Sequence, residues 1–281
     1  MFVATPSFRR SDPGSLAWRR CRSLVLGAAA AVLVLAAPAR WAQAQITLVA
    51  VQDETNRLGP HRAQGAIIWS HGRAVDVEDS LAPTPNYVQA TRTAGWDIFR
   101  LNRMRASDTL PASGAALARE ADRLKTAGYR RVVLAGQSFG GFISLIAAGQ
   151  SDAIDAVIAT APAAFGSFQD SYDTFRLNAT KLYELLSRVR RARVALVFFH
   201  GDIFDPGGRG ERSEAILAAR GLPRLVIDQP PRLVSHWASS GPEFADRFAG
   251  CLTAFAENDV ARGALNCETI TGGRHQVAEI R

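Results

Sequence analysis

Short apolar runs rich in β-branched residues alternate along the chain with longer stretches of helical periodicity. The apolar runs predict strands at 46–51, 66–70, 97–101, 131–135, 156–160, 194–200 and 224–228. The periodic stretches predict helices at about 112–127, 139–149, 172–189, 209–220 and 242–257. Strands that alternate with helices are typical of a parallel sheet with crossover helices, so we expect an α/β fold whose mostly parallel sheet has about seven strands flanked by helices.

The beginning of the chain departs from this pattern. Several arginines precede an uncharged apolar run at 23–37, and the triplet Ala42-Gln43-Ala44 fits an A-x-A cleavage site. The run spans about 15 residues, which is short of the roughly 20 that a membrane-spanning helix needs. We therefore expect a signal peptide at 1–44, a single domain at 45–281, a periplasmic or secreted location and no stable membrane association after cleavage. An uncleaved membrane anchor is the alternative.

Removal of residues 1–44 changes the charge of the protein. The whole chain has 33 basic and 26 acidic residues, but the first 44 hold six arginines and one aspartate, which leaves a net charge of only +2. This near neutrality argues against a nucleic-acid partner. Cys251 and Cys267 remain, and in an oxidising compartment we expect them to form a disulfide, with two buried free thiols as the alternative. No metal-binding spacing is present, so we expect neither a metal nor a cofactor.

The segment Gly-Gln-Ser-Phe-Gly at 136–140 lies between a predicted strand and a predicted helix. Its two glycines leave room where the strand and the helix approach each other, and they would hold the serine at a sharp turn. The N–H groups at the start of the helix would face the place where negative charge develops. Ser138 is therefore the candidate nucleophile, and it requires a histidine as base and a carboxylate that orients the histidine.

The base and the acid are sought later in the chain. His236, in "SHW", follows the last predicted strand and is the candidate base among the five histidines. The strand at 194–200 leads into "HGDIFD", which offers Asp202 and Asp205. We favour Asp205 because it lies farther into the loop, whereas Asp202 lies nearer the strand end and is the residue expected to cap the turn. The expected triad is Ser138, His236 and Asp205, with Asp202 as the alternative acid.

Four segments in this order, "IIWSHGR" (67–73), "GQSFG" (136–140), "HGDIFD" (200–205) and "SHW" (235–237), resemble those of α/β-hydrolases, near the small esterases and dienelactone-hydrolase-like members. The resemblance covers 46–257. It implies that the strand ending in His-Gly leads into an oxyanion loop, where the backbone N–H of Arg73 is one donor and that of Phe139 the other. It further implies that His71 and His200 are structural.

These residues predict an exported serine hydrolase that cleaves an ester or related acyl bond of a small molecule through an acyl-enzyme. The short connection at 161–192 predicts a small cap and an open site. Its aromatic side chains would line a pocket or belong to the core: Phe165, Phe168, Tyr172 and Phe175. Two alternatives stay open, namely an acyltransferase with the same triad and a non-catalytic binding protein that keeps the fold.

Overall fold

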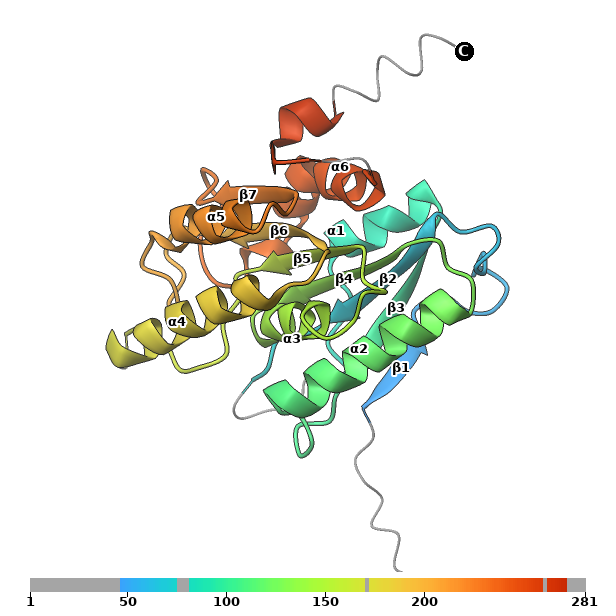
Figure 1. The fold of residues 1–281 in the computed structure, drawn as a ribbon, viewed down its shortest axis with the longest axis horizontal. Helices are drawn as coiled ribbons and strands as arrows, with labels where there is room; N and C mark the ends of the chain where they lie inside the picture. Colours follow the sequence, from blue (N-terminus) through green and yellow to red (C-terminus); the bar gives the residue numbers. More distant parts are fainter. Residues whose placement is uncertain (1–45, 75–80, 170–171, 260–261, 272–281) are drawn as a thin grey trace, which may run out of the picture. The chain divides into compact units, whose positions relative to one another are not determined.

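The computed structural model describes residues 46–74, 81–169, 172–259 and 262–271, which belong to one compact unit (Figure 1). The predicted signal peptide at 1–44 lies outside the described residues. The strands form an eight-stranded sheet in the order β1-β3-β2-β4-β5-β6-β7-β8. They are β1 (Thr47–Ala50), β2 (Gly65–Ser70), β3 (Trp96–Asn102), β4 (Val132–Gln137), β5 (Ala156–Thr160), β6 (Arg193–Phe198), β7 (Arg224–Asp228) and β8 (Ala264–Leu265).

Helices cover both faces of this sheet. The described helices are α1 (Asn86–Gln89), η1 (Ala90–Ala94), α2 (Leu110–Thr126), α3 (Phe139–Ala148), α4 (Tyr172–Arg188), α5 (Arg209–Ala219), η2 (Ala238–Ser240) and α6 (Pro242–Glu257). Helices α2 to α5 pack on one face, and α1 and α6 pack on the other (Figure 1). Helix α4 packs against α3 and α5, and the described remainder of its connection to β5 is the loop 161–169.

The predicted parallel α/β architecture is confirmed. Strand β1 pairs antiparallel with β3, and every other pair in the described sheet is parallel. Each of the seven predicted strands is present, and β8 adds an eighth at the edge beside β7. The parallel strands share one carboxyl edge, and open α/β sheets bind their ligands at that edge.

The apolar runs are nearly continuous because the central strands are buried on both faces. In β2, Ala66 and Ile68 pack against the α2 and α3 side, while Ile67 and Trp69 pack against the α1 and α6 side. All six residues of β2, β4 and β6 are buried. Such strands lack the alternation of polar and apolar residues that half-exposed strands show. They were therefore predicted from continuous apolar runs.

A disulfide joins Cys251 of α6 to Cys267, just beyond β8. The pairing predicted from the even number of cysteines in the domain is thereby confirmed. Among the described residues, no helix is both long enough and apolar enough to cross a membrane.

Candidate active site

Four loops meet at the carboxyl edge of the sheet. They follow β2, β4, β6 and β7, and they carry Gly72, Ser138, Asp202 and His236. Ser138 and His236 line the same cavity, together with Gly72. The topology therefore brings together segments that are far apart in sequence, as the expected arrangement requires.

Ser138 occupies the sharp turn between β4 and α3. It has φ 55° and ψ −119°, a backbone conformation that a residue with a side chain adopts only at an energetic cost. A Cβ atom on Gly140 would overlap the carbonyl of Ser70, and one on Gly136 would overlap the backbone of Gly140. The glycines are thus required by the close approach of strand and helix, and the turn projects a half-buried serine toward the cavity.

The two expected oxyanion donors flank this turn. Phe139 is the first residue of α3, so its N–H lacks an acceptor within the helix. A Cβ on Gly72 would come within 2.6 Å of Gln137 Oε1 and 3.5 Å of the Ser138 Cβ, so the loop that leads to Arg73 passes beside Ser138. The guanidinium of Arg73 lies 5.4 Å from the centre of the Phe139 ring, so the side chains of the two segments are in contact.

His236 is buried and pairs with Asp202. Its Nδ1 lies 2.9 Å from Asp202 Oδ1 and 3.0 Å from Oδ2. Because a carboxylate only accepts hydrogen bonds, Nδ1 carries the proton and Nε2 is left as the basic nitrogen. The Asp202 carboxylate also accepts the N–H of Phe204, whose ring packs 4.4 Å from the imidazole.

The prediction that Asp205 partners His236 is wrong. Asp205 is buried, but its Oδ2 lies 3.1 Å from Nε of the fully buried Arg209, and its Oδ1 accepts the N–H of Gly207. A buried guanidinium needs a carboxylate partner, and Asp205, four residues before Arg209, provides it. The roles that we assigned are therefore reversed: Asp205 supports the turn, and Asp202 reaches the histidine.

A buried arginine, Arg103, supports the loop that follows β2. Arg103 donates to the backbone carbonyl of His71 and, at 3.2 Å, to that of Gly72. Its charge is balanced by Asp108, which lies 2.7 Å away and also accepts the hydroxyl of Ser113. This group was not predicted from the sequence, because an arginine shortly after a strand gives no local sign that it will be buried.

Gln137 joins the turn at Ser138 to the loop that carries His236. Its Nε2 donates to the carbonyl of His236 at 3.1 Å, and the side chain is buried. The histidine loop is held a second time where the N–H of Ser235 donates to the carbonyl of His200 at 2.9 Å. Gln137 occupies one of the two unspecified positions of the serine motif. Its partner lies in a distant loop, so the motif does not predict this hydrogen bond.

The side chain of His71 forms a hydrogen bond within the loop that follows β2. Its Nδ1 donates to the carbonyl of Gly72 at 2.6 Å. Burial, followed by the positive charge of Arg103, lowers the pKa of His71 to about 4. The imidazole is therefore neutral near pH 7, in keeping with a structural role.

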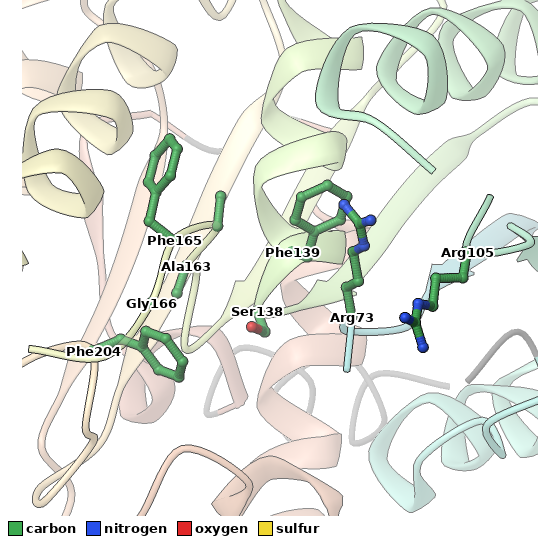
Figure 2. A pocket seen from close by; sticks show the side chains of 9 residues that line it. Arg73, Arg105, Ser138, Phe139, Ala163, Phe165, Gly166 and Phe204 are labelled. Atoms are coloured by element: carbon green, nitrogen blue, oxygen red, sulfur yellow. The ribbon is translucent and has the colours of Figure 1, made fainter. Parts of the chain in front are cut away.

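Two cavities meet at Ser138, and Arg73 and Phe204 also line both of them. The first, which we call the Arg105 cavity, has a volume of about 450 Å³ (Figure 2) and is lined by Arg73, Arg105, Ser138, Phe139, Ala163, Ala164, Phe165, Gly166 and Phe204. The second, which we call the His236 cavity, has a volume of about 470 Å³ and includes Trp69, Trp237 and Pro83. Of the four aromatic residues that we considered for a pocket, Phe165 lines the Arg105 cavity. The ring of Phe175 instead packs against those of Phe168 and Tyr172.

Comparison with solved structures identifies the fold. A monoacylglycerol lipase of Paleococcus ferrophilus superimposes with a TM-score of 0.56 at 13% identity, over 76% of this chain and 99% of the lipase. An acylaminoacyl peptidase of Pyrococcus horikoshii gives 0.53 at 14% identity, over 80% of this chain and 44% of the peptidase. A puromycin-hydrolyzing peptidase of Mycobacterium tuberculosis gives 0.51 at 16% identity, over 73% of this chain and 37% of that one.

This chain has the α/β-hydrolase fold, as the resemblance implied. It spans less than half the length of the two peptidases. No protein-family model and no curated protein sequence matches it.

Proposed function

We propose that this protein is a serine hydrolase that cleaves an ester or related acyl bond of a small molecule. The observation that carries the proposal is the conjunction at one cavity of Ser138, held at positive φ, with a buried His236 whose Nδ1 is bonded to Asp202. This combination supplies a nucleophile, a base and a group that orients the base. The lipase and peptidases that share the fold act on acyl bonds according to their names, which supports this reaction class.

In this mechanism Ser138 Oγ attacks the acyl carbonyl while His236 Nε2 takes its proton. Asp202 keeps the other nitrogen protonated and stabilises the imidazolium that forms. The N–H groups of Phe139 and Arg73 donate to the oxyanion of the tetrahedral intermediate. His236 then gives the proton to the departing alcohol. In the second half of the reaction His236 takes a proton from water, which attacks the acyl-enzyme and releases the acid.

A fluorophosphonate probe and a short p-nitrophenyl ester test the proposal. We expect the wild-type protein to be labelled and to hydrolyse the ester, and we expect Ser138→Ala to lose both properties while it keeps its melting temperature. Ser187→Ala, an exposed serine on α4, is the matched control and retains both. Hydrolysis that persists in Ser138→Ala would overturn the proposal, and ester exchange onto an added alcohol in place of hydrolysis would favour an acyltransferase.

We further propose that the protein is exported and acts in the periplasm or outside the cell. The signal-like pattern at 1–44 and the Cys251–Cys267 disulfide support this location, since disulfides persist in oxidising compartments. N-terminal sequencing of the protein recovered from the periplasm and the medium should find a chain that begins at Gln45. A chain that keeps its first 44 residues in the cytoplasm would contradict the proposal.

A further inference from the structure

A groove lies over helix α3, and we call it the α3 groove. Helices α2 and α4 flank α3 and pack against it (Figure 1). The groove has a volume of about 560 Å³. Its apolar lining residues are Leu110, Pro111, Leu145, Ile146, Phe165 and Leu185. The mechanism proposed above gives this groove no role.

The α3 groove adjoins the site through Phe165. This residue lines the groove and also the Arg105 cavity, so the two spaces border each other at its side chain. Figure 2 shows the Phe165 ring directed away from Ser138. The backbone N–H of Phe165 donates to Oδ1 of the fully buried Asn178 at 3.1 Å, whereas Phe165 as a whole is 38% exposed. The backbone at this junction is therefore held in place, while the ring has room to change its rotamer.

Helix α3 forms a continuous floor from the Arg105 cavity into the groove. Phe139, its first residue, lines the cavity, and Ile146 and Gly149 line the groove. Their spacing of seven and then three positions places the three residues on one face of the helix. The helix rises about 15 Å between Phe139 and Gly149, at 1.5 Å per residue. An extended chain that begins at Ser138 can follow this face along that length.

The polar residues that line the groove are compatible with an apolar occupant. They are Gln150, Lys181 and Arg188. Gln150 and Arg188 are exposed, and Nζ of Lys181 lies 3.3 Å from Glu184. Side chains of this kind cover apolar surface with their stems while their charged ends stay in water. No carboxylate is among the described residues that line the groove, so a hydrocarbon chain would desolvate none there.

We propose that the acyl group of the substrate is a long hydrocarbon chain that passes Phe165 and lies in the α3 groove. This assignment rests on the proposed function, because the chain begins at the carbonyl that Ser138 attacks. The hydrophobic effect drives the chain out of water and onto the apolar residues of the groove. Hydrolysis breaks the acyl–oxygen bond, and water supplies the hydroxyl of the released fatty acid and the proton of the released alcohol.

A pair of esters that differ only in chain length tests this assignment. The esters are p-nitrophenyl butyrate and p-nitrophenyl decanoate, each kept below its solubility limit. We expect the wild-type kcat/KM to be at least about tenfold higher for the decanoate, because each fully buried CH₂ group contributes up to about fourfold. The ratio of the two values in one preparation does not depend on the folded fraction, so it reports on the groove even in a destabilised variant.

Two substitutions in the groove should lower this ratio. Ile146→Asn places an amide on the floor, and Pro111→Glu places a charge on an exposed wall residue in the first turn of α2. We expect the ratio of decanoate to butyrate to fall about tenfold in each variant, because the chain loses apolar contact. Ile216→Asn on α5 is the matched control, since both isoleucines are half-buried and pack against the same core, but Ile216 does not line the groove. It should keep the wild-type ratio.

The outcomes separate the groove from the proposed function. A wild-type protein that cleaves the butyrate faster, or a ratio unchanged in both groove variants, would overturn the assignment to the groove. The same holds if Ile216→Asn lowers the ratio as much as Ile146→Asn does. If the fluorophosphonate probe labels Ser138 but the decanoate is not cleaved, the groove assignment fails alone. If neither ester is cleaved and Ser138 is not labelled, the proposed function fails and the groove assignment fails with it.

Discussion

The turn after β4 and the loop after β6 both carry residues of the candidate site, but they are specified in different ways. At the serine turn, backbone sterics fix the residue types, because any side chain at Gly136 or Gly140 would collide with main-chain atoms. In the loop after β6, two aspartates three residues apart are both buried and have distinct partners. A local motif therefore predicts the position of Ser138, whereas the aspartate that pairs with His236 is determined by the partners of both aspartates, Arg209 nearby and His236 in another loop.

The largest expected effect is on kcat, and it follows from replacing Asp202, the acid that contacts His236. Replacement of Asp202 by Asn would place an amide donor against Nδ1 and favour the wrong imidazole tautomer. We expect kcat for a p-nitrophenyl ester to fall about 10⁴-fold while the protein stays folded. Steady-state kinetics of the purified variant, with circular dichroism for folding, measure both quantities.

Asp205→Asn is the matched control for that substitution, since it makes the same chemical change three residues away. It leaves the buried Arg209 without its carboxylate, so the free energy of unfolding should fall by about 3–5 kcal/mol, as measured in urea. The folded fraction should keep kcat within about tenfold of the wild type. If Asp205→Asn were the variant that lost 10⁴-fold in kcat, our original choice of acid would be restored.

The next effect probes the serine turn. Gly140→Ala forces a methyl group onto the carbonyl of Ser70, and we expect the free energy of unfolding to fall by about 3 kcal/mol. Gly250→Ala, in α6 with no atom near the added methyl, should instead gain about 0.5–1 kcal/mol. Equal stabilities of the two variants in a urea titration would contradict the steric account of the motif.

The smallest effect comes from His71, beside the serine turn. Burial lowers the pKa of His71 in the folded protein to about 4, below its value in the unfolded chain. The folded state therefore has its full stability from neutral His71 above about pH 6.5, and it loses stability as the pH falls toward 4. The free energy of unfolding should fall by about 2 kcal/mol between pH 7 and pH 5 from this group alone. Subtraction of the same profile for His71→Gln isolates the contribution, and parallel profiles would refute it.

Most of the fold could be predicted from the sequence, because most of its helices and strands are determined by the pattern of their own residues. Each long helix and each core strand has a periodicity or an apolar run that its own residues define, and the end of α6 at Glu257 agrees with the expectation. The short elements α1, η1 and β8 were missed, because an element of two to five residues is too short to have a period. The strand β8 is defined by its pairing with β7, which a single sequence does not display.

The residues of the candidate site also fall into two groups, those that a local pattern predicts and those whose roles depend on contacts elsewhere in the fold. Ser138, Phe139 and His236 were predicted from motif and order, and Ser138 lines one cavity with Phe139 and another with His236. Asp202 was ranked second because the competing demand of Arg209 for Asp205 depends on burial. The supports at Arg103 and Gln137 depend on contacts across 31 or more positions of the chain, which no local rule contains.

The disulfide at the end of the domain also bears on how the sheet meets other chains. Strand β7 would be an edge with open N–H and C=O groups, and unprotected edges of this kind recruit further strands into aggregates. The two residues of β8 cover part of that edge, and the Cys251–Cys267 bond anchors the segment that carries them to α6. Reduction of this bond would therefore favour self-association through β7 before it altered the chemistry at the opposite end of the strands.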